Sequence, residues 1–173
     1  MTREKKTAYL GLGTNLGDRL ANLNYSLELL FQKPGLQLKA CSNIYETKPV
    51  GGPEQGLFLN ACIALETSLA PGELLQTMLI VEHKMKRVRK ERWGPRIIDL
   101  DLLVYEGTIV NTPVLQLPHP RLAKRDFVLL PLADIAPELF IPGINQTVKQ
   151  ILAGRKTNSD VKLYPGSDWC RSL

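Results

Sequence analysis

Two aspartates follow a cluster of cationic side chains in the segment RVRKERWGPRIIDLDLLVY, which begins at residue 87. In an extended strand, residues two apart point to the same face, so Asp99 and Asp101 present their carboxylates together while their apolar neighbours face the other way. Carboxylates this close repel each other, and Mg²⁺ relieves the repulsion while leaving room for water and substrate phosphates. The alternative to a metal site is that DLD marks the solvent-facing side of an ordinary amphipathic strand. Taken alone, the triplet favours this alternative.

The arginines of this segment change that balance. They are Arg87, Arg89, Arg92 and Arg96. Their planar, permanently charged forks suit phosphate oxygens, and phosphoryl or pyrophosphoryl transfer needs such cations beside metal-binding carboxylates. They could instead pair with nearby surface acids. Trp93, next to a Gly-Pro corner, argues against a purely solvated loop, because an indole in a polar loop usually covers a ring or a hydrophobic pocket.

Two other motifs, taken alone, are better explained by structural roles than by catalytic or binding roles. The segment GLGTNLG, residues 11–17, lacks the GK[ST] ending of a phosphate-binding loop, so its glycines are expected to allow close backbone approach and a turn into the first helix. His119 lies between prolines in LPHPR and becomes a functional candidate only if the fold brings it toward the arginines. His83 is expected to be a surface residue.

The composition is that of a globular protein. The 173 residues are 44% hydrophobic and 23% charged, which fits one domain spanning residues 1–173. The net charge of +5 indicates an anionic partner without separating nucleic acid, nucleotide and membrane surface. No apolar stretch approaches the roughly 20 residues of a membrane span, and no signal-peptide pattern is present, so a cytoplasmic location is expected.

The three cysteines are Cys41, Cys62 and Cys170. Their odd number and the lack of a CxxC pair argue against a disulfide framework and against a zinc site. Cys41 and Cys62 lie in apolar runs and are expected to be buried as small hydrophobes.

Hydrophobic periodicity predicts strand, helix, strand, strand, helix, strand. The predicted segments are a strand at 7–15, a helix at 20–31, strands at 36–47 and 58–68, a helix starting at Pro71 with Leu74, Met78, Val81, Met85 and Val88 on one face, and a strand at 97–105. This order predicts an α+β fold, a ferredoxin-like antiparallel sheet with both helices on one face. Residues 128–136 and 146–154 are expected to be helical, and 156–173 to form an irregular tail.

Four stretches resemble one family in the family's own order: AYLGLGTNLGDR, YETKPVGGPEQGLFLNAC, RVRKERWGPRIIDLDLL and LPHPRLAKRDFVLLPL. The family is 6-hydroxymethyl-7,8-dihydropterin pyrophosphokinase, and the resemblance extends from about residue 8 to residue 151. RWGPR followed by IDLD is highly specific as a unit. The resemblance implies transfer of the β,γ-diphosphate of ATP to the 6-hydroxymethyl oxygen of the pterin, with release of AMP, in folate biosynthesis.

The resemblance also implies a set of site residues. Asp99 and Asp101 match the carboxylates that hold two Mg²⁺ ions, and with Arg87, Arg89 and Arg96 they form the expected catalytic group. The residues implied to bind ATP are Glu82, Arg87, Arg89, Arg92, Arg96, Leu102, Val114, Leu115, Gln116, His119 and Arg125. The residues implied to bind the pterin are Thr47, Pro49, Val50, Phe58, Asn60, Trp93, Asp99 and Phe127. Small-molecule substrates, no nucleic acid, no membrane and a monomeric chain are expected.

The chain departs from the family pattern at three positions. Lys48 stands where a relative carries proline, Thr14 where serine is common, and Lys86 where glycine often precedes RVR. Lys86 could change the flexibility of the arginine-rich loop that follows it, which in this family is expected to close over ATP.

The competing hypothesis is an RNA-binding module, because a basic ferredoxin-like sheet with aromatic residues also binds single strands. The sequence lacks the aromatic RNP1 pattern, and carboxylates beside the arginines would repel a phosphate backbone unless a metal intervened. An enzyme-derived protein without activity is disfavoured, because every expected charged position is present. Mg²⁺-dependent ATP binding would separate the enzyme from a module with salt-sensitive oligonucleotide binding.

Overall fold

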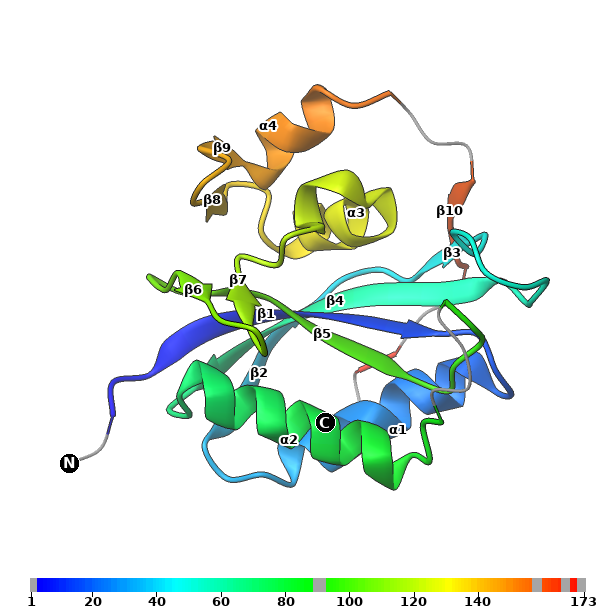
Figure 1. Cartoon of the computed structure of the whole chain (residues 1–173), viewed down its shortest axis with the longest axis horizontal. Coiled ribbons are helices and arrows are strands. Elements are labelled where there is room, and N and C mark those ends of the chain that lie inside the picture. Colours follow the sequence, from blue (N-terminus) through cyan, green and yellow to red (C-terminus); the bar gives the residue numbers. More distant parts are fainter. Residues whose placement is uncertain (1–2, 89–92, 157–159, 166–168, 171–173) are drawn as a thin grey trace.

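An antiparallel sheet lies at the centre of the fold, with helices on both of its faces (Figure 1). The computed structural model describes residues 3–88, 93–156, 160–165 and 169–170. The sheet order is β10-β3-β4-β1-β5, with β2 also paired to β4. The strands of this sheet are β1 Lys6–Thr14, β2 Leu36–Cys41, β3 Tyr45–Thr47, β4 Phe58–Thr67, β5 Asp99–Tyr105 and β10 Val161–Leu163.

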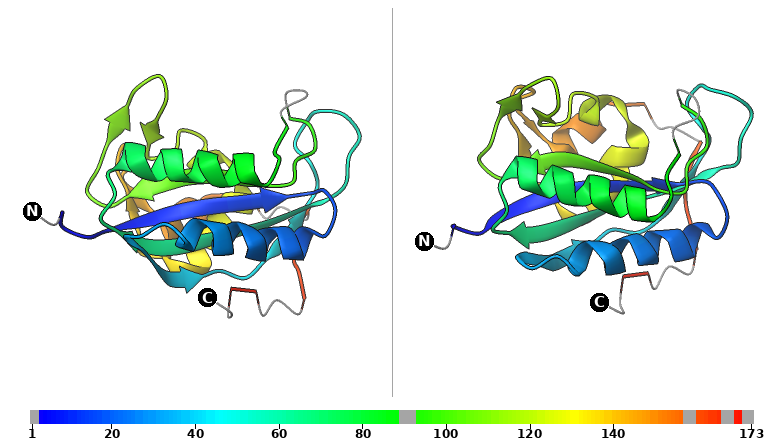
Figure 2. Two further views of the ribbon diagram at one scale, coloured as in Figure 1. Left: turned by 90° about the horizontal axis from the view of Figure 1, so that it is seen from below. Right: turned by 60° about the horizontal axis from the view of Figure 1, so that its bottom comes forward.

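Helices α1 (Arg19–Phe31) and α2 (Pro71–Lys84) cover the same face of this sheet, which is clearest from below (Figure 2). The order β1, α1, β2 with β3, β4, α2, β5 is the ferredoxin-like α+β arrangement and confirms the prediction. The strand expected over 36–47 is divided into β2 and β3, and both pieces pair with β4. At the division, Cys62 N donates to Ser42 Oγ over 2.8 Å, a side-chain bond that the alternating pattern does not predict.

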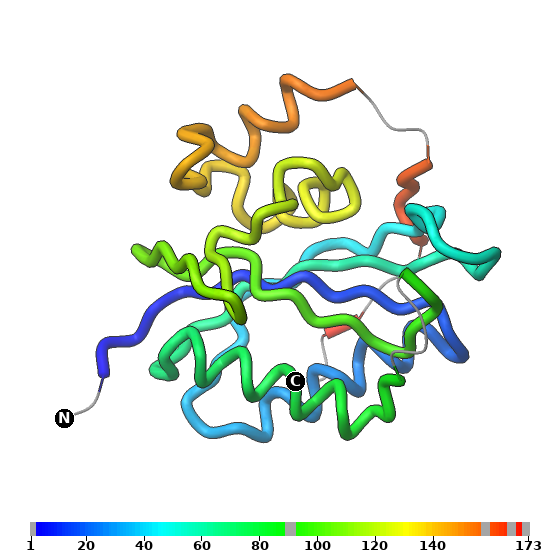
Figure 3. The backbone as a smooth tube through the Cα atoms, in the orientation of Figure 1, coloured from blue at the N-terminus to red at the C-terminus, as the bar shows by residue number. Residues whose placement is uncertain are grey.

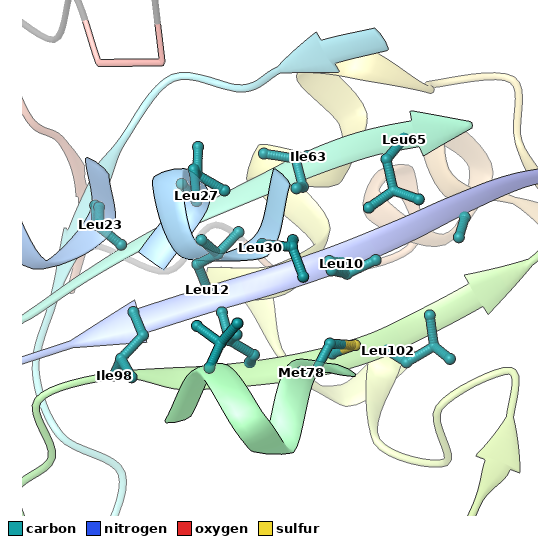
Figure 4. Close-up of a cluster of buried hydrophobic side chains, with 14 of the residues drawn as sticks. Leu10, Leu12, Leu23, Leu27, Leu30, Ile63, Leu65, Met78, Ile98 and Leu102 are labelled. Atoms are coloured by element: carbon teal, nitrogen blue, oxygen red, sulfur yellow. The ribbon is translucent and has the colours of Figure 1, made fainter. Parts of the chain in front are cut away.

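The core on this face is built from leucines that recur at helical spacing. Leu23, Leu27 and Leu30 of α1 are fully buried against Leu10 of β1 and Ile63 of β4 (Figure 4). The N-terminus of α1 follows from local chemistry, because Gly17 adopts a φ of +64° and the Asp18 side chain accepts from Ala21 N over 3.0 Å. Helix α2 begins at Pro71 as predicted but ends at Lys84, so Val88 lies beyond it and is exposed.

The opposite face of the sheet is covered by α3 (Asp126–Ile135), and α4 (Val148–Ala153) packs on α3 on its side away from the sheet (Figure 1). Leu103 of β5 points to this side and packs with the buried residues Leu122, Val128, Leu129, Leu132, Ile141, Val148 and Ile151. The short elements here are the 3₁₀ helix η1 (Leu122–Lys124) and two small hairpins, β6 Val110–Asn111 with β7 Gln116–Leu117 and β8 Phe140–Ile141 with β9 Gln146–Thr147. Both helices expected in this region are confirmed.

The C-terminal segment returns to the sheet, and the sequence pattern does not predict this. Strand β10 pairs with β3 at the sheet edge (Figure 3). Beyond it, Trp169 is 5% exposed and donates its indole N–H to Ser42 O over 2.8 Å. A disulfide joins Cys41 to Cys170, which corrects the argument against disulfides. That argument used only the number of cysteines and their spacing in the sequence. Neither indicates that the fold brings together two cysteines 129 residues apart. Cys62 is buried and outside any disulfide, as expected, whereas Cys41 is only half-buried, which corrects the expectation of burial for both.

Within the described part of the chain, no helix combines the length and the apolar character needed to cross a membrane.

Replacing Trp169 with alanine tests whether the C-terminal segment contributes to stability. Trp169→Ala should lower the free energy of unfolding by about 3 kcal/mol, because a buried indole is removed and its space is not refilled. Urea unfolding measures the loss. The control is Leu163→Ala on the same segment, which is 60% exposed and should change stability by no more than about 0.5 kcal/mol. Equal effects of the two substitutions would contradict the docked position of Trp169.

Candidate active site

A cavity of about 300 Å³ lies between the sheet, the start of α3 and the loops that follow β3 and precede β5. Its floor is the backbone of β1 at Gly11 and Gly13. A Cβ built on Gly13 would lie 3.1 Å from Asn60 Oδ1, and one on Gly11 would lie 3.5 Å from the Leu103 side chain. Only glycine leaves this space open to a ligand.

The register of β1 explains which side chains surround this floor. Gly13 lies opposite Asn60 of β4 on one side and Asp99 of β5 on the other. Gly11 lies between Cys62 and Asp101 in the same way. The sheet therefore carries the two aspartates on one edge of the floor and the amide of Asn60 on the other. The predicted common face of Asp99 and Asp101 is confirmed, and Leu100 between them is buried toward the helices.

The two carboxylates are held by arginines. Asp99 contacts Arg87 Nη2 at 2.8 Å and Arg96 Nη1 at 2.6 Å, whereas Asp101 Oδ2 lies 3.7 Å from Arg125 Nη1. Burial, and next the charge of Asp99, raise the pKa of Asp101 well above its ordinary value, while Arg125 opposes the shift. The pair therefore favours an additional cation in the cavity.

The donor set fits Mg²⁺ better than zinc. Among the described residues, no cluster of three or more His, Cys, Asp or Glu side chains is arranged around a common point. Two carboxylates that leave further positions to water and substrate phosphates suit Mg²⁺, whereas a structural zinc site needs four protein ligands. Asp99 and Asp101 are the residues that would hold the ion.

Glu82 and Arg87 form a buried support behind β5. Glu82 is 4% exposed, accepts from Leu100 N over 2.8 Å and also pairs with Arg87. Burial raises the pKa of Glu82, and the hydrogen bond from Leu100 N and the charge of Arg87 oppose that shift. Since Arg87 also contacts Asp99, this support fixes the first aspartate from behind. Neither residue lines the cavity, and their contact with ATP stays a prediction.

Cationic side chains line the cavity. They are Lys48, Arg96, Arg121, Lys124 and Arg125, of which the last three belong to η1 or flank it, next to the start of α3. Arg125 also lies over the ring of Phe127, 5.5 Å from its centroid. Sequence reasoning missed Arg121 and Lys124, although the three-residue spacing of basic residues in PRLAKR is a signal for one side of a 3₁₀ turn.

All eight residues predicted to bind the pterin line this one cavity: Thr47, Pro49, Val50, Phe58, Asn60, Trp93, Asp99 and Phe127. Asn60 and Thr47 are buried, and Asn60 Nδ2 donates to Thr47 Oγ1 over 2.8 Å. Trp93 is 46% exposed with a φ of +59°, and its carbonyl accepts from Gln55 Nε2 over 2.8 Å. The cavity therefore combines aromatic faces with a fixed amide, as a flat ring with polar edges requires.

Other residues predicted to bind ATP lie outside the cavity. Leu102 faces the helices, and Val114, Leu115, Gln116 and His119 lie in or just after the β6–β7 hairpin. His119 Nδ1 accepts from Arg121 N over 3.2 Å, and its backbone N–H donates to Leu103 O over 2.8 Å. Arg89 and Arg92 lie outside the described residues. The nucleotide roles of all these residues stay predictions.

Comparison with known proteins identifies the family to which the chain is similar. Residues 9–137 match the model of the 7,8-dihydro-6-hydroxymethylpterin-pyrophosphokinase (HPPK) family. Proteins named 2-amino-4-hydroxy-6-hydroxymethyldihydropteridine pyrophosphokinase are similar to the chain. The one from Methylorubrum extorquens is 49% identical over 84% of this chain and 91% of its own length. The one from Bacillus subtilis is 43% identical over 76% of this chain and 79% of its own length.

A solved structure shares the fold. Wild-type Plasmodium falciparum HPPK-DHPS with pteroate matches at a TM-score of 0.73 and 14% identity, over 94% of this chain and 48% of that one. The chain thus spans about half of that solved protein, and the likeness is one of fold. Fold and cavity define a protein of the ferredoxin-like α+β class. Within that class, the chain belongs to the 7,8-dihydro-6-hydroxymethylpterin-pyrophosphokinase family.

The environment of His119 predicts a pH dependence of stability. Burial, with Arg125 and Arg121 nearby, lowers the pKa of His119 to about 4. An unfolded histidine takes up a proton near pH 6.5, so unfolding is favoured as the pH falls from about 6.5 toward 4. His119→Gln should therefore lose less stability than the wild type between pH 7 and pH 5, as measured by urea unfolding. His83→Gln, at an exposed position on α2, is the control. An unchanged decline in His119→Gln would contradict a neutral, half-buried imidazole at this position.

Proposed function

We propose that this chain is an ATP- and Mg²⁺-dependent pyrophosphokinase of folate biosynthesis. It transfers the β,γ-diphosphate of ATP to the 6-hydroxymethyl oxygen of 6-hydroxymethyl-7,8-dihydropterin and releases AMP. The observation that carries the proposal is that the carboxylates of Asp99 and Asp101 open into the same cavity as the amide of Asn60. A site for a polar flat ring and a site for a metal-bound phosphate chain are thus adjacent.

The pterin is assigned to the side of the cavity nearest Asn60. Its ring lies over the glycine floor, with Phe127 and Trp93 available to stack and the fixed amide of Asn60 available to its polar edge. Thr47 orients that amide by accepting one of its hydrogens. The substituent at C6 then points toward Asp99 and Asp101.

The triphosphate is assigned to the cationic side of the cavity. Arg96, Arg121, Lys124 and Arg125 compensate its charge, and Arg87, held behind Asp99, keeps that carboxylate in place. Asp99 and Asp101 would hold two Mg²⁺ ions, which neutralise the phosphate oxygens and help to align the reacting groups. The hydroxymethyl oxygen attacks the β-phosphorus, the bond to the α,β-bridging oxygen breaks, and AMP leaves as the hydroxyl proton is released. Catalysis comes mainly from positioning and charge compensation.

The defining experiment measures AMP release from ATP and Mg²⁺ with and without 6-hydroxymethyl-7,8-dihydropterin. AMP that forms only with the pterin is the expected result. ADP as the product would indicate an ordinary kinase with another acceptor. If no nucleotide is turned over, the oligonucleotide-binding alternative becomes the hypothesis to test.

Neutralising either aspartate should remove turnover and leave the fold intact. Asp99→Asn and Asp101→Asn keep the side-chain shape and remove the charge that would hold the metal. The rate of AMP formation should fall on the order of 100-fold or more, while circular dichroism stays unchanged. Glu138→Gln, an exposed acid distant in sequence, is the control. Near-normal turnover of either aspartate variant would refute the metal-holding roles.

Removing the amide of Asn60 should weaken binding of the pterin selectively. Asn60→Ala should raise the KM for the pterin by about 10-fold, because hydrogen bonds to a buried polar edge are lost. The KM for ATP should change little. Steady-state kinetics with each substrate varied in turn measures both values, with the exposed Asn43→Ala as control. A larger change in the KM for ATP than in that for the pterin would contradict the assignment of this side of the cavity.

A further inference from the structure

Arg155 lies just after α4, beyond the residues that match the family model, and reaches across to the start of α3. Its Nη1 donates to Ala123 O over 2.9 Å and its Nη2 to Lys124 O over 3.4 Å. Its Nε pairs with the carboxylate of Asp126, whose side chain is 11% exposed. One guanidinium therefore binds three residues, Ala123, Lys124 and Asp126, at the junction of η1 and α3.

This junction carries residues that line the cavity. Lys124, Arg125 and Phe127 line it, whereas Asp126 between them is turned to Arg155. Arg125 itself has an extended backbone, with φ −123° and ψ 104°, and its carbonyl accepts from Val128 N and Leu129 N to start α3. A shift of this one extended residue would move both the guanidinium near Asp101 and the aromatic ring beside it.

The chemistry of the contact suits arginine specifically. The last carbonyls of a helical turn have no partner within the turn, and here the planar fork of Arg155 supplies donors to two of them while its charge pairs with Asp126. Lysine could keep the charge but not the fork. Moreover, α4 is attached to the rest of the protein by apolar residues, since Val148 is 0% and Ile151 7% exposed. Loss of Arg155 therefore leaves the helix interface in place.

We propose that Arg155 is a positioning residue of the enzyme that sets Arg125 and Phe127 for the two substrates without touching either substrate. This inference rests on the proposed function for the assignment of Arg125 to the phosphates and Phe127 to the pterin. It assigns a role in substrate binding to the residue that follows α4, although α4 lies on the far side of α3 from the sheet (Figure 1).

The first test compares Arg155→Ala, Arg155→Lys and Lys149→Ala. Lys149 lies on α4 and forms an exposed ion pair with Glu138, so it controls for loss of a cation from the same region of the chain. Arg155→Ala should raise the KM values for both ATP and the pterin by about 10-fold, with a smaller change in kcat. Arg155→Lys should lie between the wild type and Arg155→Ala. KM values equal to those of Lys149→Ala in both Arg155 variants would overturn the proposal.

A double-mutant cycle tests the route through Arg125. In an Arg125→Ala background, Arg155→Ala should leave the KM for ATP nearly unchanged, because the side chain that it positions for the phosphates is gone. The KM for the pterin should still rise, through Phe127. An equal rise in the KM for ATP in both backgrounds would show that Arg155 does not act through Arg125.

Hydrogen exchange provides a readout that does not depend on activity. Arg155→Ala should accelerate exchange of the amides of Val128 and Leu129, whose acceptor is Arg125 O, while Lys149→Ala should not. Should Arg155→Ala fail to fold, the same comparison is made with Arg155→Lys. Unchanged exchange would overturn the positioning role even if the chain has a different substrate. Changed exchange without pterin-dependent AMP release would instead refute the proposed function alone.

Discussion

The pairing of β1 with both β4 and β5 is the constraint on which the rest of the site depends. The register sets Gly13 between Asn60 and Asp99, and Gly11 between Cys62 and Asp101. Side chains alternate along a strand, so a slip of one residue would turn Leu10 and Leu12 toward the ligand and the glycines into the core. The buried leucines under α1 and α2 oppose that slip, because it would expose them. Core packing and substrate space are thus fixed by the same set of backbone hydrogen bonds.

The charges of the site fall into an inner and an outer group. Arg87 is 9% exposed at its side chain and is enclosed by Glu82 and Asp99, so its partners are set by the fold. Arg96 and Arg125 are 22% and 24% exposed and pair with the two aspartates from the cavity side. In the proposed reaction, a phosphate chain that enters with its metal would take over these outer arginines, whereas the inner one would keep Asp99 oriented. This division provides electrostatic preorganisation at the aspartates together with cations that can change partners.

Local sequence pattern was sufficient to predict the order of the main elements and the common face of Asp99 and Asp101. The family resemblance added the residues of the loop after β3 that are predicted to bind the pterin. No local signal in the sequence indicates that this loop lies near Phe127. Features that depend on contacts distant in sequence were missed, including β10 on the edge of β3, the Cys41–Cys170 bond and the burial of Glu82 behind Leu100. Each of these contacts joins two segments that are distant in the sequence, whereas hydrophobic periodicity describes only one segment at a time.

The glycine floor has a consequence for resistance to inhibitors. A compound that rests on Gly11 and Gly13 contacts main-chain atoms, which no point mutation removes. Escape by adding a side chain at Gly13 would place a Cβ 3.1 Å from Asn60 Oδ1 and fill part of the cavity. Selection for drug escape should therefore act on the loops around the cavity, where Val50 is 74% and Trp93 46% exposed, and spare its floor. Compounds that draw most of their affinity from the floor would therefore leave few viable routes of escape by mutation.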